Sequence, residues 1–356
     1  MNYINKINWR FWVGIIISAI FIGILLYRVQ FEEVILTIRQ ANYLFVTPAI
    51  GIYFVSIFFR ALRWHYILRP IERVPIGTLF IVIIIGYTAN NLLPARLGEI
   101  VRAYYLARKT SVRDSTSLAT IAVERVYDGI TLLVFGAIAI TLLVGEGMFK
   151  FIENFYQSKI FFLGVGGLII FSLALAFVIF SGSASIQNFL KFLIRIAPVR
   201  MQPILHRNVE WFMEGLAVAD SPRRHIGIFL WSCPVWLLES FMYLLVAYSF
   251  HINHQFESLN ALIWVMVLLN STSNLATAIP STIGGIGPFE IAAQQTLLVF
   301  DVSPSIGAIY AAFLHLVALW LPITLIGLLI LWHQNWSLKT PPLNLSDTKP
   351  DHDMEQ

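Results

Sequence analysis

Apolar runs of the length that crosses a bilayer recur along this 356-residue chain, and they limit its fold more than any other feature. A helix needs about 20 mostly apolar residues to cross roughly 30 Å of hydrocarbon, where no water can satisfy backbone polar groups. Hydrophobic residues make up 58% of the chain and charged residues 12%, against about 25% charged in a soluble domain. We therefore predict an all-α, polytopic integral membrane protein. Spans are expected near residues 11–27, 42–62, 77–93, 117–144, 159–180, 224–250, 258–280 and 304–333.

The rest of the chain divides into short helices and a tail. Two apolar or amphipathic stretches, 95–109 and 286–300, are too short to cross a bilayer alone. Residues 183–222 mix Lys and Arg with large apolar residues at helical spacing, which is typical of helices that lie on a membrane surface. Residues 339–356 are polar and contain prolines, so we expect a disordered tail after one transmembrane domain over 1–338.

The distribution of Lys and Arg predicts the orientation. Arg60, Arg63, Arg69 and Arg73 follow the second expected span, and a second basic cluster lies within 183–222, so both regions should be cytoplasmic. The connections at 28–41, 145–158 and 251–257 lack an excess of basic residues and should lie outside.

A third basic cluster, Arg108, Lys109 and Arg113, decides how residues 77–109 are arranged. It lies inside only if 77–93 enters the membrane and 95–109 returns to the same face, as a re-entrant helical hairpin.

The C-terminal half repeats this pattern. The span near 258–280 ends in "NSTSNLATAIPSTIGGIGPFE", and a second short apolar stretch follows. Because 251–257 is expected outside, this hairpin should enter from the opposite face. We thus expect about eight transmembrane helices, including two oppositely oriented re-entrant hairpins related as an inverted repeat. Interrupted helices in corresponding positions of two halves indicate a transporter's binding site near the midplane.

Charged residues follow the first break. Arg96, Glu99 and Arg102 are spaced to lie along one side of a helix that begins just after Pro94. Free backbone N–H groups at that helix start, together with guanidinium groups, suit a phosphate oxygen. The alternative is a juxtamembrane helix whose charges face water.

Three further charges, Glu124, Arg125 and Asp128, lie inside an expected span, and Arg125 can reach Asp128 three residues on. Ionisable groups at this depth are costly, which favours a functional role. The alternative is an internal salt bridge that fixes helix packing.

The second break is followed by Glu290, which could accept a proton, contact an ammonium group, or cap the returning helix. Glu239 and His315 are lone polar groups in mid-span, for which interhelical hydrogen bonds are the simpler interpretation. Four asparagines flank the two breaks and can bond backbone groups that the breaks leave free; they are Asn90, Asn91, Asn270 and Asn274.

No catalytic residue, cofactor or metal site is expected, and the chain is not predicted to be an enzyme. Cys233 is the only cysteine, which excludes an intramolecular disulfide framework and a Cys-rich metal site. No H-x-x-x-H, G-x-S-x-G or nucleotide-binding signature occurs. The net charge of +4 is explained by cytoplasmic-side Lys and Arg rather than by nucleic-acid binding.

Three motifs follow one another at the breaks and in the span between them. They are N-x-x-P-A-R-x-G-E-x-x-R from Asn91 to Arg102, E-R-x-x-D from Glu124 to Asp128, and P-x-x-x-G-G-x-G-x-x-E from Pro280 to Glu290. Together they resemble the lysylphosphatidylglycerol synthase transmembrane region family, over about residues 10–335. The resemblance implies a flippase-like domain, as in the N-terminal part of the multiple peptide resistance factor, which moves an aminoacylated phospholipid between leaflets. The 356 residues contain no cytosolic aminoacyltransferase domain, so we expect no synthase activity.

We therefore predict a flippase or transporter of the cell inner (plasma) membrane that moves a phospholipid or lipid-linked head group between leaflets. Its expected partners are the lipid substrate and the bilayer, while a homo-oligomer and a separate lipid-modifying enzyme are left open. Two alternatives are a membrane-embedded transferase acting on a lipid-linked substrate and a small-solute transporter. The candidate substrate-binding residues are Asn91, Arg96, Glu99, Arg102, Glu124, Arg125, Asp128, Asn274, Gly284, Gly285 and Glu290.

Overall fold

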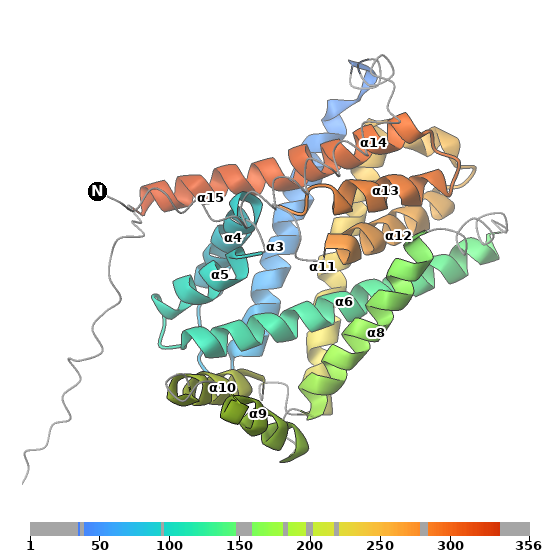
Figure 1. The fold of residues 1–356 in the computed structure, drawn as a ribbon. Helices are drawn as coiled ribbons and strands as arrows, with labels where there is room; N and C mark the ends of the chain where they lie inside the picture. Colours follow the sequence, from blue (N-terminus) through green and yellow to red (C-terminus); the bar gives the residue numbers. More distant parts are fainter. Residues whose placement is uncertain are drawn as a thin grey trace, which may run out of the picture.

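The computed structural model describes residues 35, 39–93, 96–146, 159–180, 184–196, 202–216, 221–277 and 284–334, and the regular structure in these residues is helical (Figure 1). The expected span at 11–27, the tail at 339–356, Pro94 and Pro280 lie outside the described residues. The helices are η1 (Tyr43–Phe45), α3 (Val46–Leu68), α4 (Ile76–Leu92), α5 (Gly98–Ala107), α6 (Asp114–Gly145), α8 (Lys159–Phe180), α9 (Ala184–Ile196), α10 (Gln202–Leu216), α11 (Pro222–Ser249), η2 (Ile252–Gln255), α12 (Leu259–Thr277), α13 (Pro288–Leu298), α14 (Pro304–Phe313), η3 (Leu314–Trp320) and α15 (Leu321–His333).

Five helical segments among the described residues are long and apolar enough to cross a membrane, so the chain is a multi-pass membrane protein. Two further apolar helices are shorter, at Ile76–Leu92 and Val165–Ile179. The five segments are Tyr43–Leu68, Asp114–Gly145, Pro222–Ser249, Leu259–Thr277 and Pro304–His333.

The second expected span is longer than predicted, and this corrects the reading of its basic residues. Helix α3 continues to Leu68, past the expected end near residue 62, so Arg60 and Arg63 lie inside the helix and are buried. They are not loop residues, and Arg69 and Arg73 remain as the basic residues that follow the span. Helix α3 packs along α11, while α6 packs against α10, α12 and α8 (Figure 1).

The two short helices each pack against the helix that precedes them, α5 on α4 and α13 on α12. In the first pair the contact is close, because a Cβ added at Gly98 would lie 2.5 Å from the Asn90 backbone nitrogen and closer still to the Gly86 carbonyl oxygen. The Asn90 side-chain oxygen accepts a hydrogen bond from the Gly98 N–H at 2.8 Å. Asn90 thus satisfies an N–H group left free at the start of α5, as expected for the asparagines that flank the breaks.

Helix α5 begins at Gly98 and not directly after Pro94. Arg96 therefore lies in the turn before the helix, with a left-handed φ of 54°. This backbone conformation is uncommon for a residue with a side chain. The Arg96 guanidinium nevertheless lies 4.0 Å from the Glu99 carboxylate.

Contacts link the two ends of each short pair, the name used here for α4–α5 and for α12–α13. The amide and hydroxyl of Ser111, which follows α5, donate to the carboxylate of Glu72, which precedes α4, at 3.0 and 2.6 Å. The rings of Phe256 and Phe300, which flank the α12–α13 pair, have centroids 6.1 Å apart. Each pair therefore ends close to where it begins.

Helix α10 packs against the first turns of α6 (Figure 1). The Thr116 hydroxyl donates to the Trp211 carbonyl at 3.2 Å, and the Arg113 guanidinium lies 4.5 Å from the centroid of the Trp211 ring. The basic connection between α5 and α6 and the helix pair α9–α10 thus occupy the same end of the molecule.

Candidate substrate cavity

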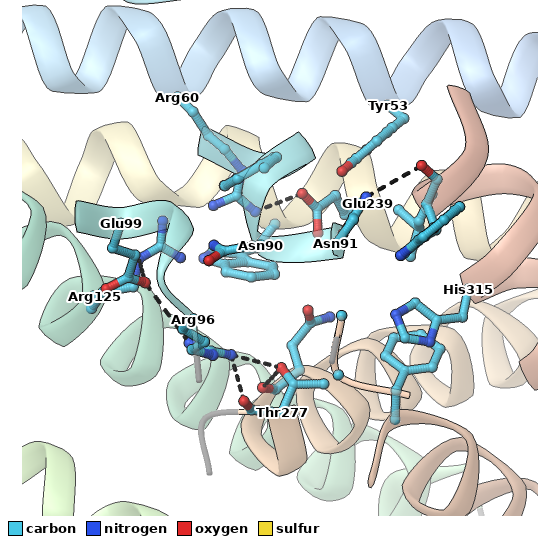
Figure 2. Close-up of a pocket in the computed structure, with 18 residues that line it drawn as sticks. Tyr53, Arg60, Asn90, Asn91, Arg96, Glu99, Arg125, Glu239, Thr277 and His315 are labelled. Carbon is cyan, nitrogen blue, oxygen red and sulfur yellow. Dashed lines mark hydrogen bonds and ion pairs between the residues drawn. The ribbon is translucent and has the colours of Figure 1, made fainter. Parts of the chain in front are cut away.

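A cavity of about 170 Å³ lies where the ends of α4 and α12 meet α3, α6, α11 and η3 (Figure 2). Its wall is polar and aromatic. The lining residues are Tyr53, Arg60, Tyr87, Asn90, Asn91, Arg96, Glu99, Arg125, Trp236, Glu239, Asn274, Thr277, Gly284, Gly285, Phe289, His315, Leu319 and Trp320.

An arginine cluster forms one side of this cavity and extends behind it. We use this name for five arginines and four carboxylates linked by ion pairs: Arg60, Arg63, Arg96, Arg102 and Arg125, with Glu99, Glu124, Asp128 and Glu239. Its formal charge is therefore +1. Because buried charges are costly unless paired, the near-balance explains how so many ionised groups share the interior of a helical bundle.

The buried part of the cluster joins three elements. Arg63 of α3 contacts Asp128 at 2.6 Å and Glu124 at 3.2 Å, both on α6. Arg102 of α5 donates to both oxygens of Glu124, at 3.0 and 2.9 Å, and its guanidinium lies 3.7 Å from the Trp64 ring centroid. This two-point geometry is among the stronger ion-pair arrangements, and it leaves Arg102 facing Glu124 rather than the cavity.

Two other arginines lie at the cavity wall with close carboxylate partners. Arg60 contacts Glu239 of α11 at 2.6 Å and Asp128 at 3.5 Å. Arg125 contacts Glu99 at 3.3 Å and Asp128 at 3.2 Å, so the predicted pairing of Arg125 with Asp128 is present.

Arg96 is the least paired arginine of the cluster. Its nearest carboxylate, Glu99, lies 4.0 Å away, and its side chain is 33% exposed. The guanidinium instead donates to the carbonyl and hydroxyl oxygens of Thr277 at 2.5 and 3.1 Å (Figure 2). Because Thr277 is the last residue of α12, this contact links the turn of the first short pair to the end of a helix in the second.

The opposite side of the cavity is formed at the second break. Gly284, Gly285 and Gly287 have φ angles of 62°, 77° and 103°. Such left-handed backbone favours glycine, and a Cβ at Gly284 would also lie 2.9 Å from the Trp320 indole nitrogen. These glycines therefore allow the chain to turn tightly against η3 before α13 begins.

Glu290 caps α13, the simpler of the interpretations drawn from the sequence. Its carboxylate accepts a hydrogen bond from the Gly287 N–H at 2.6 Å, and its second oxygen lies 2.6 Å from His315 Nδ1. Glu290 is 3% exposed and does not line the cavity, whereas His315 does. The expected interhelical hydrogen bonds of Glu239 and His315 are both present.

The structure brings most of the candidate residues from distant parts of the chain to one cavity. Seven line it: Asn91, Arg96, Glu99, Arg125, Asn274, Gly284 and Gly285. Four are buried behind its wall: Arg102, Glu124, Asp128 and Glu290. Asn91 and Asn274 also bond neighbouring helices, Asn91 to the Thr324 hydroxyl at 2.9 Å and Asn274 to the Tyr243 hydroxyl at 3.0 Å.

Sequence reasoning missed Arg60, Arg63 and the aromatic wall. The two arginines follow an apolar run without a helix breaker before Pro70, and a spacing of three puts them on one helix face. That spacing was the signal for a buried pair. The aromatic lining residues give no such signal, because aromatic residues are frequent throughout the chain.

No group of three or more His, Cys, Asp or Glu side chains is arranged to hold a metal ion within the part of the chain that the structure describes. The cavity's donors and acceptors are instead guanidinium, carboxylate, amide, hydroxyl, imidazole and aromatic groups, which suit a polar organic molecule or head group.

The fold and the cavity define a class of protein: a multi-pass helical membrane protein with a charged cavity between two interrupted helix pairs. The family model described as lysylphosphatidylglycerol synthase TM region matches residues 11–327, so this chain belongs to that family. The family resemblance drawn from the three sequence motifs is thereby confirmed.

Similar proteins occur in several archaea. The chain is 26% identical over 341 residues to the UPF0104 membrane protein PH1989 of Pyrococcus horikoshii, covering 89% of this chain and 95% of that protein. It is 24% identical over 296 residues to the glycosyltransferase AglD of Haloferax volcanii, covering 78% of this chain and 47% of AglD. A match to the UPF0104 membrane protein MJ1595 of Methanocaldococcus jannaschii, 27% identical over 163 residues, covers 45% of this chain and 48% of that protein. The aligned part thus spans about half the length of AglD and MJ1595. No solved structure matches the chain.

Proposed function

We propose that this protein moves a membrane lipid between leaflets by passing the head group through the cavity while the acyl chains stay in hydrocarbon. The observation that carries the proposal is Arg96, a part-exposed guanidinium at the cavity wall whose nearest carboxylate is 4.0 Å away. A head group cannot cross hydrocarbon unaided, for the same desolvation reason that makes intramembrane charge costly. A part-exposed guanidinium at the wall, without a close carboxylate partner, offers an anionic phosphate a favourable place inside the membrane.

We further propose that α4–α5 and α12–α13 are re-entrant hairpins that enter from opposite faces of the plasma membrane, within about eight transmembrane helices. The contact between Ser111 and Glu72 supports this arrangement for the first pair, and the contact between Phe256 and Phe300 supports it for the second. Opposed hairpins that meet at the midplane are a known way of building a transport site.

The cavity residues take separate roles in this proposal. Arg96 contacts the phosphate, and Arg125, which is 25% exposed, adds a second cationic group. Glu99 and Glu239 hold Arg125 and Arg60 in place by ion pairs. Arg102, Glu124 and Asp128 support this wall from behind.

One observation favours a second candidate, a membrane-embedded transferase acting on a lipid-linked substrate. The similar protein AglD is named a glycosyltransferase, although the match covers 47% of it. Turnover of a lipid-linked donor by the purified protein would favour this candidate over the flippase.

The flippase proposal is tested with purified protein in vesicles containing a fluorescent phosphatidylglycerol, where a membrane-impermeant quencher reports the outer leaflet. Wild-type protein should expose the inner-leaflet probe to the quencher, and Arg96→Gln should slow this at least about tenfold, because a hydrogen bond to a charged group contributes about 1.5–3 kcal/mol. Arg69→Gln, at an exposed arginine outside the cavity, is the matched control and should behave as wild type. Equal rates in vesicles with and without the protein would contradict the proposal.

A further inference from the structure

His315 and Glu290 form a histidine–carboxylate pair inside the helical bundle. His315 Nδ1 lies 2.6 Å from a Glu290 oxygen, and both side chains are more than nine-tenths buried. An ionised carboxylate can only accept hydrogen bonds, so Nδ1 carries the proton in this contact. In a neutral imidazole the other nitrogen, Nε2, is then left with its lone pair.

The Nε2 atom is available to the cavity. His315 lines the cavity on the side opposite Arg96 (Figure 2). Among the described residues, the hydrogen bond of the His315 side chain is the one that Nδ1 makes with Glu290, and none reaches Nε2. The ring is held in one plane by Phe289, whose centroid lies 4.3 Å away at 26°.

The local backbone is also unusual. His315 belongs to η3, a π-helical segment within the otherwise α-helical run from Pro304 to His333. Such segments are rare and occur frequently at functional sites.

A charge count gives this pair a role. The arginine cluster carries +1, and ionised Glu290 with neutral His315 carries −1, so the charges on the two sides of the cavity balance. A phosphate with one negative charge changes the sum to −1. Net charge is costly in a low-dielectric interior. Uptake of one proton at Nε2, which makes His315 an imidazolium, restores the balance.

The groups that face His315 from neighbouring elements agree with this role. Glu290 of α13 contacts it directly, and Tyr53 of α3 and Tyr87 of α4 line the same cavity. The remaining charged groups of the cavity wall belong to the arginine cluster, where Arg60 is paired with Glu239 and Arg125 with Glu99. The two carboxylates of the wall, Glu99 and Glu239, are thus both held by arginines.

We propose that His315, oriented by Glu290, is a proton-binding site that couples lipid movement to proton movement. A proton from water bonds to the Nε2 lone pair when the anionic head group enters, and it leaves when the head group leaves. This inference rests on the proposed function. It adds the proton as a second transported species and assigns its site to His315 rather than to a carboxylate.

The experiment uses vesicles with a pH-sensitive dye trapped inside and phosphatidylglycerol added to the outer leaflet alone, so that its inward movement is a net flux. Wild-type protein should move the lipid faster at pH 6 than at pH 8 and should change the internal pH only when the lipid moves. His315→Gln should lose both the pH dependence and the dye signal. His333→Gln, at the exposed end of α15, is the matched control and should keep both.

A second variant distinguishes the loss of proton binding from misfolding. Glu290→Gln removes the carboxylate that stabilises the imidazolium, so the pH response should weaken or move to lower pH. A purely structural role would lower the rate by the same factor at every pH. Lipid movement that is independent of pH, or a dye signal that survives in His315→Gln, would overturn the inference and leave the proposed function intact. Absence of lipid movement in wild type would instead overturn the proposed function.

Discussion

Two arginines of the same cluster illustrate how position decides what a charge does. Arg63 is fully buried and contacts two carboxylates within 3.2 Å, whereas Arg96 is one-third exposed and has its nearest carboxylate at 4.0 Å. The first guanidinium is bound on both sides by buried carboxylates. The second retains capacity for a ligand.

At the residue scale we predict opposite effects for these arginines. Arg63→Met should destabilise the protein by about 3–5 kcal/mol, because it removes the buried guanidinium that contacts both Glu124 and Asp128 and leaves the two carboxylates with less compensating charge. Arg96→Gln should leave stability near that of wild type. Thermal unfolding in detergent, followed by the yield of monodisperse protein, measures both. Equal losses in the two variants would assign Arg96 a structural role.

The sequence predicted part of this site. It predicted an ion pair between residues close together in the chain, but not the pairs between residues that are far apart in it. The pairing of Arg125 with Asp128 follows from a spacing of three on a helix. The partners of Arg63 and Arg60 could not be predicted in this way, because Asp128 and Glu239 lie 65 and 179 positions away. A single sequence contains no periodicity that reports such contacts.

At the element scale, the first short pair depends on close approach of two helices. A Cβ at Gly98 would meet backbone atoms of Gly86 and Asn90, whereas a Cβ at Gly77 would meet nothing within 4 Å. The sequence predicted the break after 77–93 and a short returning helix over 95–109, where the structure has α5. The observed helix starts later than predicted, at Gly98, where the Asn90 side chain of α4 accepts a hydrogen bond from the Gly98 N–H; a contact between two helices of this kind cannot be predicted from local sequence.

We therefore predict that Gly98→Ala destabilises the protein by about 1–3 kcal/mol, the usual cost of overpacking. Gly77→Ala should be neutral or slightly stabilising, since alanine favours helix more than glycine does. Unfolding in detergent compares the two substitutions directly. Tolerance of Gly98→Ala would mean that α4 and α5 can separate without cost.

At the scale of the whole molecule, the position of the basic connection Arg108–Arg113 tests the topology. It lies next to α10 and to Glu72, as expected if α4–α5 returns to the face from which it enters. We predict that single cysteines at Lys109 and Arg207, in a Cys233→Ser background, are labelled from the cytoplasmic side. A cysteine at His254 should be labelled from the opposite side. Membrane-impermeant maleimide on cells and inverted vesicles measures this, and labelling at Lys109 from outside would contradict the re-entrant arrangement.

The burial of Arg60 and Arg63 also has a consequence for synthesis. These arginines leave the ribosome 65 to 179 residues before Asp128 and Glu239, the carboxylates that pair with them in the finished protein. A helix with two unpaired guanidinium groups partitions poorly into lipid at that moment. Helix α3 should therefore wait at the insertion machinery or at the membrane surface until α6 and α11 have been made. Insertion of this protein is then a cooperative event among helices that are synthesised at different times.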